Sequence, residues 1–473
     1  MKNQIIFFLF FLFPAALLAQ TKFISQKMDV EIDKTFYGLK GKVYYVSVSG
    51  NDKNNGLKKN LPFKTLQHAS NLTKPGDIVY VMNGLYQNSK DEEILGIKRS
   101  GTKTNWIMYA ALPGHKPKLK VRAGDAVAIH GAEYLIIDGF EIEGNHPDVS
   151  LKYALAEKNS GANKITNSSG VSIHPDWNTT NYSHHVIVRN CHVYNFSGGG
   201  INSHTADYIV IENNTVHHNG YYCPWAMSGI AIYKNWNFDN FSGYKMIVRN
   251  NISYANRNYI PYFKSSNILE KRKITDGNGI IIDLTRESVK LVNGKKSIIS
   301  YSGRTLIENN LVYSNGGRGI RIFKSDHIDV INNTSYQNSQ TEGRTGDVGL
   351  AETNDVRLFN NIIYPQKNDY SIFIDNAGST VNIDYNLIYN TWNNRFPQAH
   401  NIIGLNPLFV TVSSKTEPYN FKLKPDSPAI DRGYKQFAPK IDLDGTARPV
   451  NKKFDIGAFE YRSDNSIGSN RTQ

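Results

Sequence analysis

The sequence is poor in cysteine and, beyond its first residues, in long apolar runs. Only two cysteines, Cys191 and Cys223, occur among 473 residues, so the fold does not rest on a disulfide scaffold. One disulfide between them and two buried free thiols are equally compatible with the sequence. No long stretch in the centre of the chain has helical periodicity, which argues against folds that alternate strands and helices. No motif indicates a nucleotide, flavin or haem, and we expect no organic cofactor.

The first residues have the pattern of an export signal. Lys2 precedes the apolar run from Ile5 to Leu12, and small residues follow as far as Ala19. We therefore expect residues 1–20 to be removed and residues 21–42 to form an N-terminal extension. The apolar run is short for a membrane span, so we expect no span after removal and a secreted or periplasmic protein.

The charge of the chain is unbalanced towards lysine and arginine. These number 54 against 41 aspartates and glutamates, which gives a formal net charge of +13. Such an excess favours a polyanionic partner. For an exported protein an acidic polysaccharide is a better candidate than nucleic acid, and no pattern typical of a nucleic-acid-binding module is present. We expect a monomer.

An internal repeat predicts the fold. Strings such as "VIVRNCHVYN", "MIVRNNISYA" and "TLIENNLVYS" combine alternating apolar residues with an asparagine pair, or with asparagine and cysteine. We call each such string a mark of the repeat. The first asparagines of successive marks are 23, 37, 59, 23 and 28 residues apart, and the longer gaps indicate inserted loops or a coil without a mark. Asparagine suits tight corners because it tolerates left-handed φ, and stacked asparagines can bond one another. The first asparagines of the marks are Asn190, Asn213, Asn250, Asn309, Asn332 and Asn360.

A second mark consists of strands that start at a glycine. Residues one and three after the glycine should face the core, and residues two and four should face solvent in stacked columns. At four past the glycine the column contains His174, His204, Tyr233, Asp283 and Phe323. At two past the glycine it contains Ser172, Asn202, Ala231, Ile281, Arg321 and Ala351.

These marks predict an all-β fold, a right-handed parallel β-helix that spans residues 43–462 with its caps. An amphipathic helix within Phe63 to Leu72 should cover the first coil, because exposed strand edges invite aggregation. The turn-rich segment from Phe421 to Tyr461 should cap the other end. Residues 463–473 are polar, and we expect a mobile tail.

The chain resembles secreted bacterial right-handed parallel β-helix proteins, and among them polysaccharide lyase family nine, the pectate-lyase-like group. "SNGGRGIRIF" (Ser314 to Phe323) is similar to the strand that carries the family's lysine base, and Arg321 holds that place here. "TDGNGIIIDL" (Thr275 to Leu284) is similar to the family's calcium-binding strand, with Ile281 in place of an acid. The resemblance implies a calcium site built from Asp276, Asn278 and Asp283.

Elimination on a uronic acid requires a group that neutralises the carboxylate and a base that removes the adjacent proton. We expect Arg321, Lys324, His204 and Asp283 to be the catalytic residues. Position favours Arg321 as the base, whereas lysine loses its proton more readily than arginine. The expected substrate-binding residues are His174, Tyr233, Lys234, Arg286, Arg318 and Trp225. The alternative is a solvated basic edge for the lysines and arginines, a hydrogen-bonded surface residue for the histidines, and the small core of a loop for the aromatic residues. Asp283 would instead pair with Arg286 or Arg321.

The sequence leaves two other functions open. A glycoside hydrolase on the same scaffold needs two carboxyl groups, which Asp283 with Asp276, Asp347 or Glu352 would supply. A glycan-binding protein without activity would show aromatic and polar groups without a clustered acid and base. The alternatives differ in whether Asp283, Arg321, Lys324 and His204 converge.

Overall fold

The computed structural model describes residues 33–88, 92–263, 273–292, 294–390, 399–412 and 419–463. The predicted export signal, residues 21–32 of the predicted extension and residues 464–473 of the predicted tail lie outside the described residues. No helix in the described ranges is long and apolar enough to cross a membrane.

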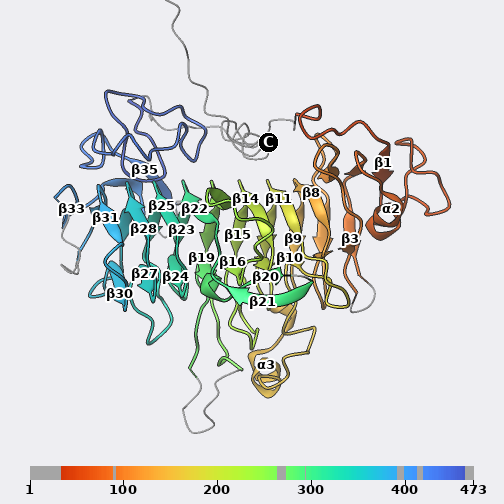
Figure 1. Ribbon diagram of the computed structural model, residues 1–473, viewed down its shortest axis with the longest axis horizontal. Helices are drawn as coiled ribbons and strands as arrows, with labels where there is room; N and C mark the ends of the chain where they lie inside the picture. Colours follow the sequence, from red (N-terminus) through yellow and green to blue (C-terminus); the bar gives the residue numbers. More distant parts are fainter. Residues whose placement is uncertain are drawn as a thin grey trace, which may run out of the picture.

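Three parallel sheets run the length of the described chain and form the walls of a stack of coils (Figure 1). The first sheet contains, in spatial order, β1 (Val43–Val46), β2 (Ile78–Val81), β5 (Ile107–Ala111), β8 (Glu133–Asp138), β11 (His184–Arg189), β14 (Asp207–Glu212), β17 (Tyr244–Arg249), β22 (Arg304–Glu308), β25 (Ile328–Ile331), β28 (Val356–Phe359) and β31 (Asn382–Asp384).

The second sheet has nine strands and is called the nine-stranded sheet below. It contains β4 (Leu95–Ile97), β7 (Val127–His130), β10 (Val171–His174), β13 (Ile201–His204), β16 (Ile230–Tyr233), β19 (Ile280–Asp283), β24 (Ile320–Phe323), β27 (Val348–Ala351) and β30 (Ile372–Asp375). The third sheet contains β3 (Leu85–Gln87), β6 (Lys118–Lys120), β9 (Glu141–Glu143), β12 (His192–Tyr194), β15 (Thr215–His217), β18 (Ile252–Tyr254), β23 (Leu311–Tyr313), β26 (Thr334–Tyr336), β29 (Ile362–Tyr364), β32 (Leu387–Ile388) and β33 (Ile402–Ile403).

Alternation along each strand builds the core. In β16, Ile230 and Ile232 are fully buried between the sheets, whereas Ala231 and Tyr233 face outward and stay partly exposed. Strands of successive coils repeat the pattern, so their inward side chains merge into one apolar column inside the stack. The predicted right-handed parallel β-helix is confirmed.

The two asparagines of each pair have different structural roles. The first asparagine of each mark sits at a corner with φ between 52° and 58°, the left-handed region that asparagine tolerates. The second asparagine points inward, and its amide bonds the same residue of the next coil, as from Asn214 to Asn251 and on to Asn310, at 3.0 Å in each step. A second ladder, from Asn219 to Asn338, runs beside it. The predicted stacking is therefore confirmed.

The predicted register of the strand in which Ala351 lies two residues past Gly349 was wrong. Gly349 pairs with Arg321, and Ala351 with Phe323, so Gly349 lies in the two-past column and Ala351 in the four-past column. Asp347 holds the place that glycine has in the neighbouring coil. Its carboxylate faces inward and accepts hydrogen bonds from Asn338, where the second ladder ends.

Both ends of the stack are covered. Helix α2 (Leu66–Leu72) begins after Thr65, whose side chain accepts a hydrogen bond from the His68 backbone, and it packs on the first coils. At the other end, β34 (Phe409–Thr411) and β35 (Asn420–Leu423) form an antiparallel pair in an apolar cluster with the C-terminal segment. Cys191 and Cys223 are buried and free, so no disulfide joins them.

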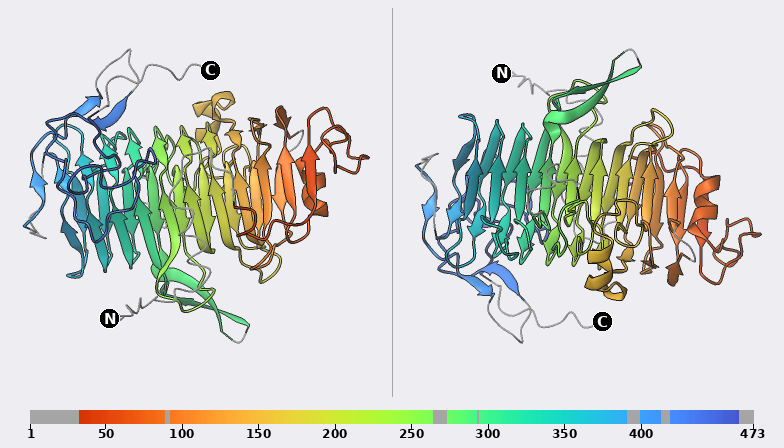
Figure 2. Two further views of the ribbon diagram at one scale, coloured as in Figure 1. Left: turned by 90° about the horizontal axis from the view of Figure 1, so that it is seen from above. Right: turned by 90° about the horizontal axis from the view of Figure 1, so that it is seen from below.

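Two insertions stand on opposite sides of the stack (Figure 2). One is the hairpin of β20 (Ser288–Val292) and β21 (Lys295–Ile299), which follows β19 through the 3-10 turn η2 (Thr285–Glu287). The other follows the turn η1 (His146–Asp148) and contains the short helix α3 (Leu151–Ala156). Both come from coils near the middle of the nine-stranded sheet.

Candidate functional site

The outward face of the nine-stranded sheet presents two stacked columns. Parallel pairing in register places each member beside the equivalent residue of the next coil, about 4.8 Å away. The first column contains His130, His174, His204, Tyr233, Asp283 and Phe323. The second contains Gly96, Ala128, Ser172, Asn202, Ala231, Ile281 and Arg321.

Charged groups gather where the two columns meet β19 and β24. We call this group the central cluster; it consists of Tyr233, Lys234, Asp276, Asp283 and Arg321. Arg321 Nη1 donates to Asp276 Oδ1 at 3.0 Å. Lys234 Nζ lies 5.5 Å from the centre of the Tyr233 ring and pairs with Glu287 Oε2 at 2.8 Å. The cluster therefore combines acids, bases and a phenol on one sheet face.

Asp283 is the least satisfied member of the cluster. Its Oδ1 is buried and has no hydrogen-bond partner among the described residues. Burial and, after it, the negative charge of Asp276 raise the pKa of the Asp283 carboxyl, and the positive charge of Arg321 lowers it. The resulting pKa is about 7. A carboxyl in this state exchanges protons near neutral pH, as a general acid or base does.

Two further arginines lie beside the cluster. Arg318 is buried, and its guanidinium stacks on the Phe373 ring at 4.6 Å. Its Nε has no hydrogen-bond partner within the described ranges. Burial, then the positive charges of Arg321 and Arg344, lower the pKa of Arg318 to about 9. Crowded cations of this kind are stabilised by a bound anion, and arginine matches a carboxylate with two parallel hydrogen bonds.

A row of rings continues the first column away from the cluster. His204 lies 4.8 Å from Tyr233 and 5.2 Å from Trp177, between ring centres. Burial lowers the pKa of His204 to about 4, with the charges of His174 and Lys234 as further causes, so His204 is neutral at pH 7. Trp177 is 63% exposed, as a ring that stacks on a sugar would be.

Asn202 carries an unusual unpaired amide. The residue is 8% exposed, and neither its Oδ1 nor its Nδ2 has a hydrogen-bond partner among the described residues. Because an unpaired buried amide is costly, the arrangement is typical of a group that bonds a ligand. Its place in the second column puts it beside Ser172 and Ala231.

Not all predicted site residues join the cluster. Asp283, Arg321, Tyr233 and Lys234 do, and His204 adjoins it. Arg318 lies beside it. The other predicted residues lie outside the cluster. Lys324 lies 3.7 Å from Glu352, and Arg286 makes two hydrogen bonds of 2.8 Å to Asp326. Trp225 donates to the Gly161 carbonyl in the α3 insertion, and His174 lies one strand beyond His204. Asp283 pairs with neither Arg286 nor Arg321, so the salt bridges considered for it were wrong.

The second carboxylate of a hydrolase cannot be Asp347. This residue is fully buried and bonded to Asn338 inside the stack, so that alternative was wrong. Glu352 lies 3.7 Å from Lys324, and of the carboxylates considered for this role Asp276 is the one whose charge acts on Asp283.

The residues predicted to bind calcium do not offer a ready donor set. Asn278 Oδ1 accepts the Arg318 backbone N–H at 2.9 Å, and its Nδ2 donates to Ser228. Asp276 is paired with Arg321 at 3.0 Å, so its carboxylate is already engaged by a positive charge. Among the described residues no group of three histidine, cysteine or acidic side chains could hold a metal ion. The residues therefore do not fit calcium.

Three residues of this face escaped sequence-based prediction as site residues. Asn202 stood in the predicted outward column, and its outward position beside His204 was the available signal. Trp177 follows β10, and Arg344 lies in the loop before β27. No repeat position marks either of these two.

The fold and the site define a right-handed parallel β-helix protein with an acid–base cluster on an outward sheet face. Residues 44–220 match the family model described as the Pel9A-like, right-handed β-helix region, which confirms the resemblance inferred from the sequence for that part of the chain. A comparison with curated proteins finds no match.

Several solved structures are similar to this chain. The crystal structure of pectate lyase Pel9A is 17% identical, with 89% of this chain and 97% of that one covered and a TM-score of 0.51. A rhamnogalacturonan lyase is 17% identical, with 82% and 97% covered and a TM-score of 0.41. A GH136 lacto-N-biosidase from Eubacterium ramulus is 14% identical, with 72% and 67% covered and a TM-score of 0.39. At 17% identity the likeness to pectate lyase Pel9A shows the fold alone.

Proposed function

We propose that the protein is a secreted carbohydrate-active enzyme that cleaves an acidic polysaccharide by β-elimination. The observation that carries the proposal is the position of Asp283, whose carboxyl has a pKa of about 7 and lies beside Arg321. A base that titrates near neutral pH and a cation that binds a carboxylate are the two groups that elimination on a uronic acid requires. The match of residues 44–220 to a family model named for Pel9A agrees with this class of reaction.

Each group of the cluster has a task in this mechanism. Arg321, with Arg318 beside it, binds the uronate carboxylate and withdraws charge from the adjacent carbon. The Asp283 carboxylate removes the proton from that carbon, the electron pair forms the carbon–carbon double bond, and the glycosidic C–O bond breaks. Burial raises the pKa of the Tyr233 hydroxyl, which therefore stays protonated and donates its proton to the leaving oxygen. The products are an unsaturated uronate and a new sugar hydroxyl.

These roles differ from those expected for the basic residues. Arg321 forms an ion pair with Asp276, and an arginine is suited to carboxylate binding rather than to proton removal. The ion pair of Lys234 with Glu287 raises the pKa of Lys234, which makes this lysine a poorer base. No step of the mechanism passes through calcium.

The test is the ultraviolet absorbance of the unsaturated product during incubation with uronic-acid polysaccharides. Asp283→Asn should abolish the rise in absorbance, because an amide cannot take the proton. Asp375→Asn is the matched control, since Asp375 is an exposed acid on the same sheet. An absorbance rise that survives in Asp283→Asn would refute Asp283 as the base.

A glycoside hydrolase is the second candidate, and the proximity of Asp276 and Asp283 favours it. Asp276 is the second cause of the raised pKa of Asp283, which is the pattern of a protonated acid beside an ionised carboxylate. This function predicts new reducing ends without ultraviolet absorbance, and loss of the reducing ends in Asp276→Asn.

A further inference from the structure

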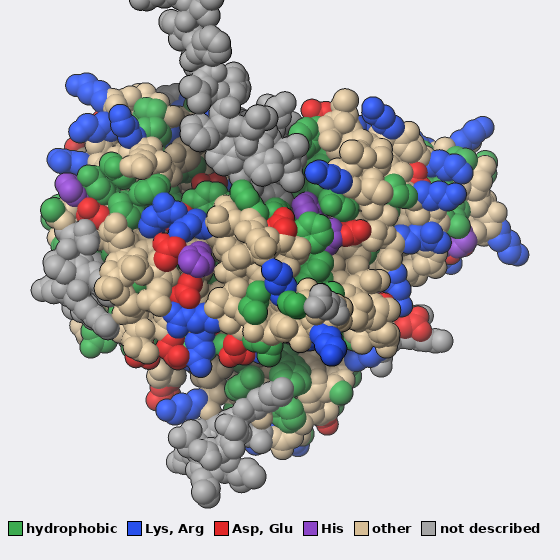
Figure 3. Space-filling view, in the orientation of Figure 1, with side chains coloured by type: hydrophobic (Ala, Val, Ile, Leu, Met, Phe, Trp, Pro, Cys, Tyr) green, Lys and Arg blue, Asp and Glu red, His purple; other side chains and the backbone are tan. Residues whose placement is uncertain are grey.

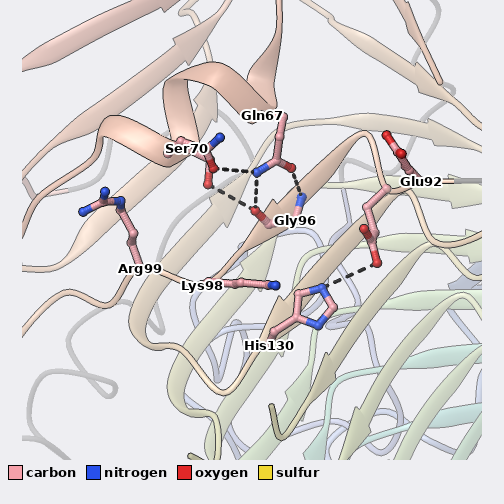
Figure 4. A pocket seen from close by; sticks show the side chains of 9 residues that line it. Gln67, Ser70, Glu92, Gly96, Lys98, Arg99 and His130 are labelled. Carbon is pink, nitrogen blue, oxygen red and sulfur yellow. Dashed lines mark hydrogen bonds and ion pairs between the residues drawn. The ribbon is translucent and has the colours of Figure 1, made fainter. Parts of the chain in front are cut away.

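A cavity of about 500 Å³ opens at the N-terminal end of the nine-stranded sheet, between α2 and β4. Figure 4 shows the side chains that surround it. Polar and charged groups dominate its wall: Gln67, Asn71, Glu93, Lys98, Arg99 and His130.

Gly96 keeps the cavity open. Its backbone is fixed by Gln67, whose Oε1 accepts the Gly96 N–H at 2.7 Å and whose Nε2 donates to the Gly96 carbonyl at 3.0 Å. A Cβ on Gly96 would project into the space between Gln67 and His130, 3.2 Å from Gln67 Oε1 and 3.9 Å from His130 Nε2. The Gln67 Nε2 also donates to Asn71 Oδ1 at 3.0 Å, so both N–H groups of this amide are used and Gln67 serves to hold the cavity wall in place.

Two positively charged side chains, Lys98 and Arg99, line the cavity. Lys98 and Arg99 are exposed and make no ion pair with any other described residue, whereas Glu93 is held by His130 at 3.5 Å. The Lys98 ammonium points towards the His130 ring (Figure 4). Basic side chains also gather around this end of the molecule on the face seen in Figure 3. The exposed Glu92 also lines the cavity, so its wall carries no net positive charge, and the exposed cations Lys98 and Arg99 are the groups that would bind a carboxylate.

A continuous row of rings joins the cavity to the central cluster. Lys98 follows Ile97, which pairs with Ile129, so Lys98 heads the column of His130, His174, His204, Tyr233 and Asp283. Ring centres are 4.6 Å apart between His130 and His174 and 5.9 Å apart between His174 and Trp177. Small side chains and the unpaired amide of Asn202 lie alongside in the second column.

We propose that this cavity is a remote subsite that binds a uronic-acid unit of the same polysaccharide chain that is cleaved at the central cluster. Lys98 binds the carboxylate of that unit, and the ring row and Asn202 contact the sugars between. The proposal rests on the proposed function. From β7 to β19 the sheet rises by four strand spacings, about 19 Å, or about four sugar units if one unit spans roughly one spacing.

The experiment measures binding rather than cleavage. Asp283→Asn, which removes the proposed base, is titrated by calorimetry with oligogalacturonides and with alginate oligomers from dimer to octamer. Affinity should rise with length until the chain reaches the cavity. Adding Lys98→Ala should lower the affinity for the octamer by about tenfold and leave that for the dimer unchanged, because a single charge-assisted hydrogen bond is lost. Adding Gly96→Leu, which fills the cavity, should have the same selective effect.

Lys58→Ala is the matched control, because it removes one exposed charge from the same basic end outside the cavity. Equal loss for dimer and octamer would indicate a structural defect and overturn the subsite. So would octamer affinities that neither Lys98→Ala nor Gly96→Leu changes. Absence of binding at every length would overturn the proposed function together with the subsite, whereas dimer binding without dependence on length would overturn the subsite alone.

Discussion

The raised pKa of Asp283 has a measurable effect on stability. In the unfolded chain this carboxyl titrates at its ordinary pKa of 3.8, and in the folded protein at about 7. Below pH 3.8 it is protonated in both states and contributes nothing. Between these values the folded state keeps a proton that the unfolded state releases, so stability falls as the pH rises and the loss is complete above about 7. At about 1.4 kcal/mol per unit of pKa, the loss is about 4 kcal/mol at most.

Asp283→Asn should therefore stabilise the protein in alkaline solution while it abolishes activity. We expect equal free energies of unfolding for variant and wild type at pH 4, and a variant more stable by about 2 to 4 kcal/mol at pH 8. Urea unfolding at the two pH values measures the difference, and Asp375→Asn should show none of it. A variant that is equally stable or less stable at pH 8 would refute the idea that Asp283 is held in a costly, proton-binding environment.

Other predictions concern the cation, the metal and the ladder. Arg321→Ala should lower kcat/KM by about a hundredfold and move the rising limb of its pH profile upward, since Arg321 lowers the pKa of Asp283; an unchanged limb would count against their coupling. A chelator should leave the rate of cleavage unchanged, and a loss restored by calcium would contradict the assignment of Arg321. Asn333→Ala should lower the free energy of unfolding by about 3 kcal/mol, because it strands the Asn310 backbone N–H and neighbouring groups inside the core. Asn60→Ala, an exposed control, should change it little in the same urea titration.

The fold was predictable because its determinants repeat. The central coils share the same alternation and the same corner asparagine, and the error in register arose where the repeat breaks. Asp347 occupies a position that is glycine in the coil before, and the next glycine, Gly349, was mistaken for the mark. Likewise α2 begins only at Leu66, after Thr65 provides its cap.

The site was predictable only in part. Column membership brought His204, Tyr233 and Asp283 together, because register places equal positions side by side. Ion pairing was not predictable, because it depends on side-chain reach and loop paths that no repeat sets. Lys324 thus turns to Glu352 in the next coil.

The amide ladders also bear on how such a molecule diversifies. Neighbouring rungs join residues between 15 and 59 positions apart in the chain, yet the amide contacts stay between 2.8 and 3.1 Å. The distance between successive coils therefore does not depend on how many residues separate two asparagines of the ladder. Loops that border the central cluster can therefore differ in length while the amide ladder inside the stack stays the same.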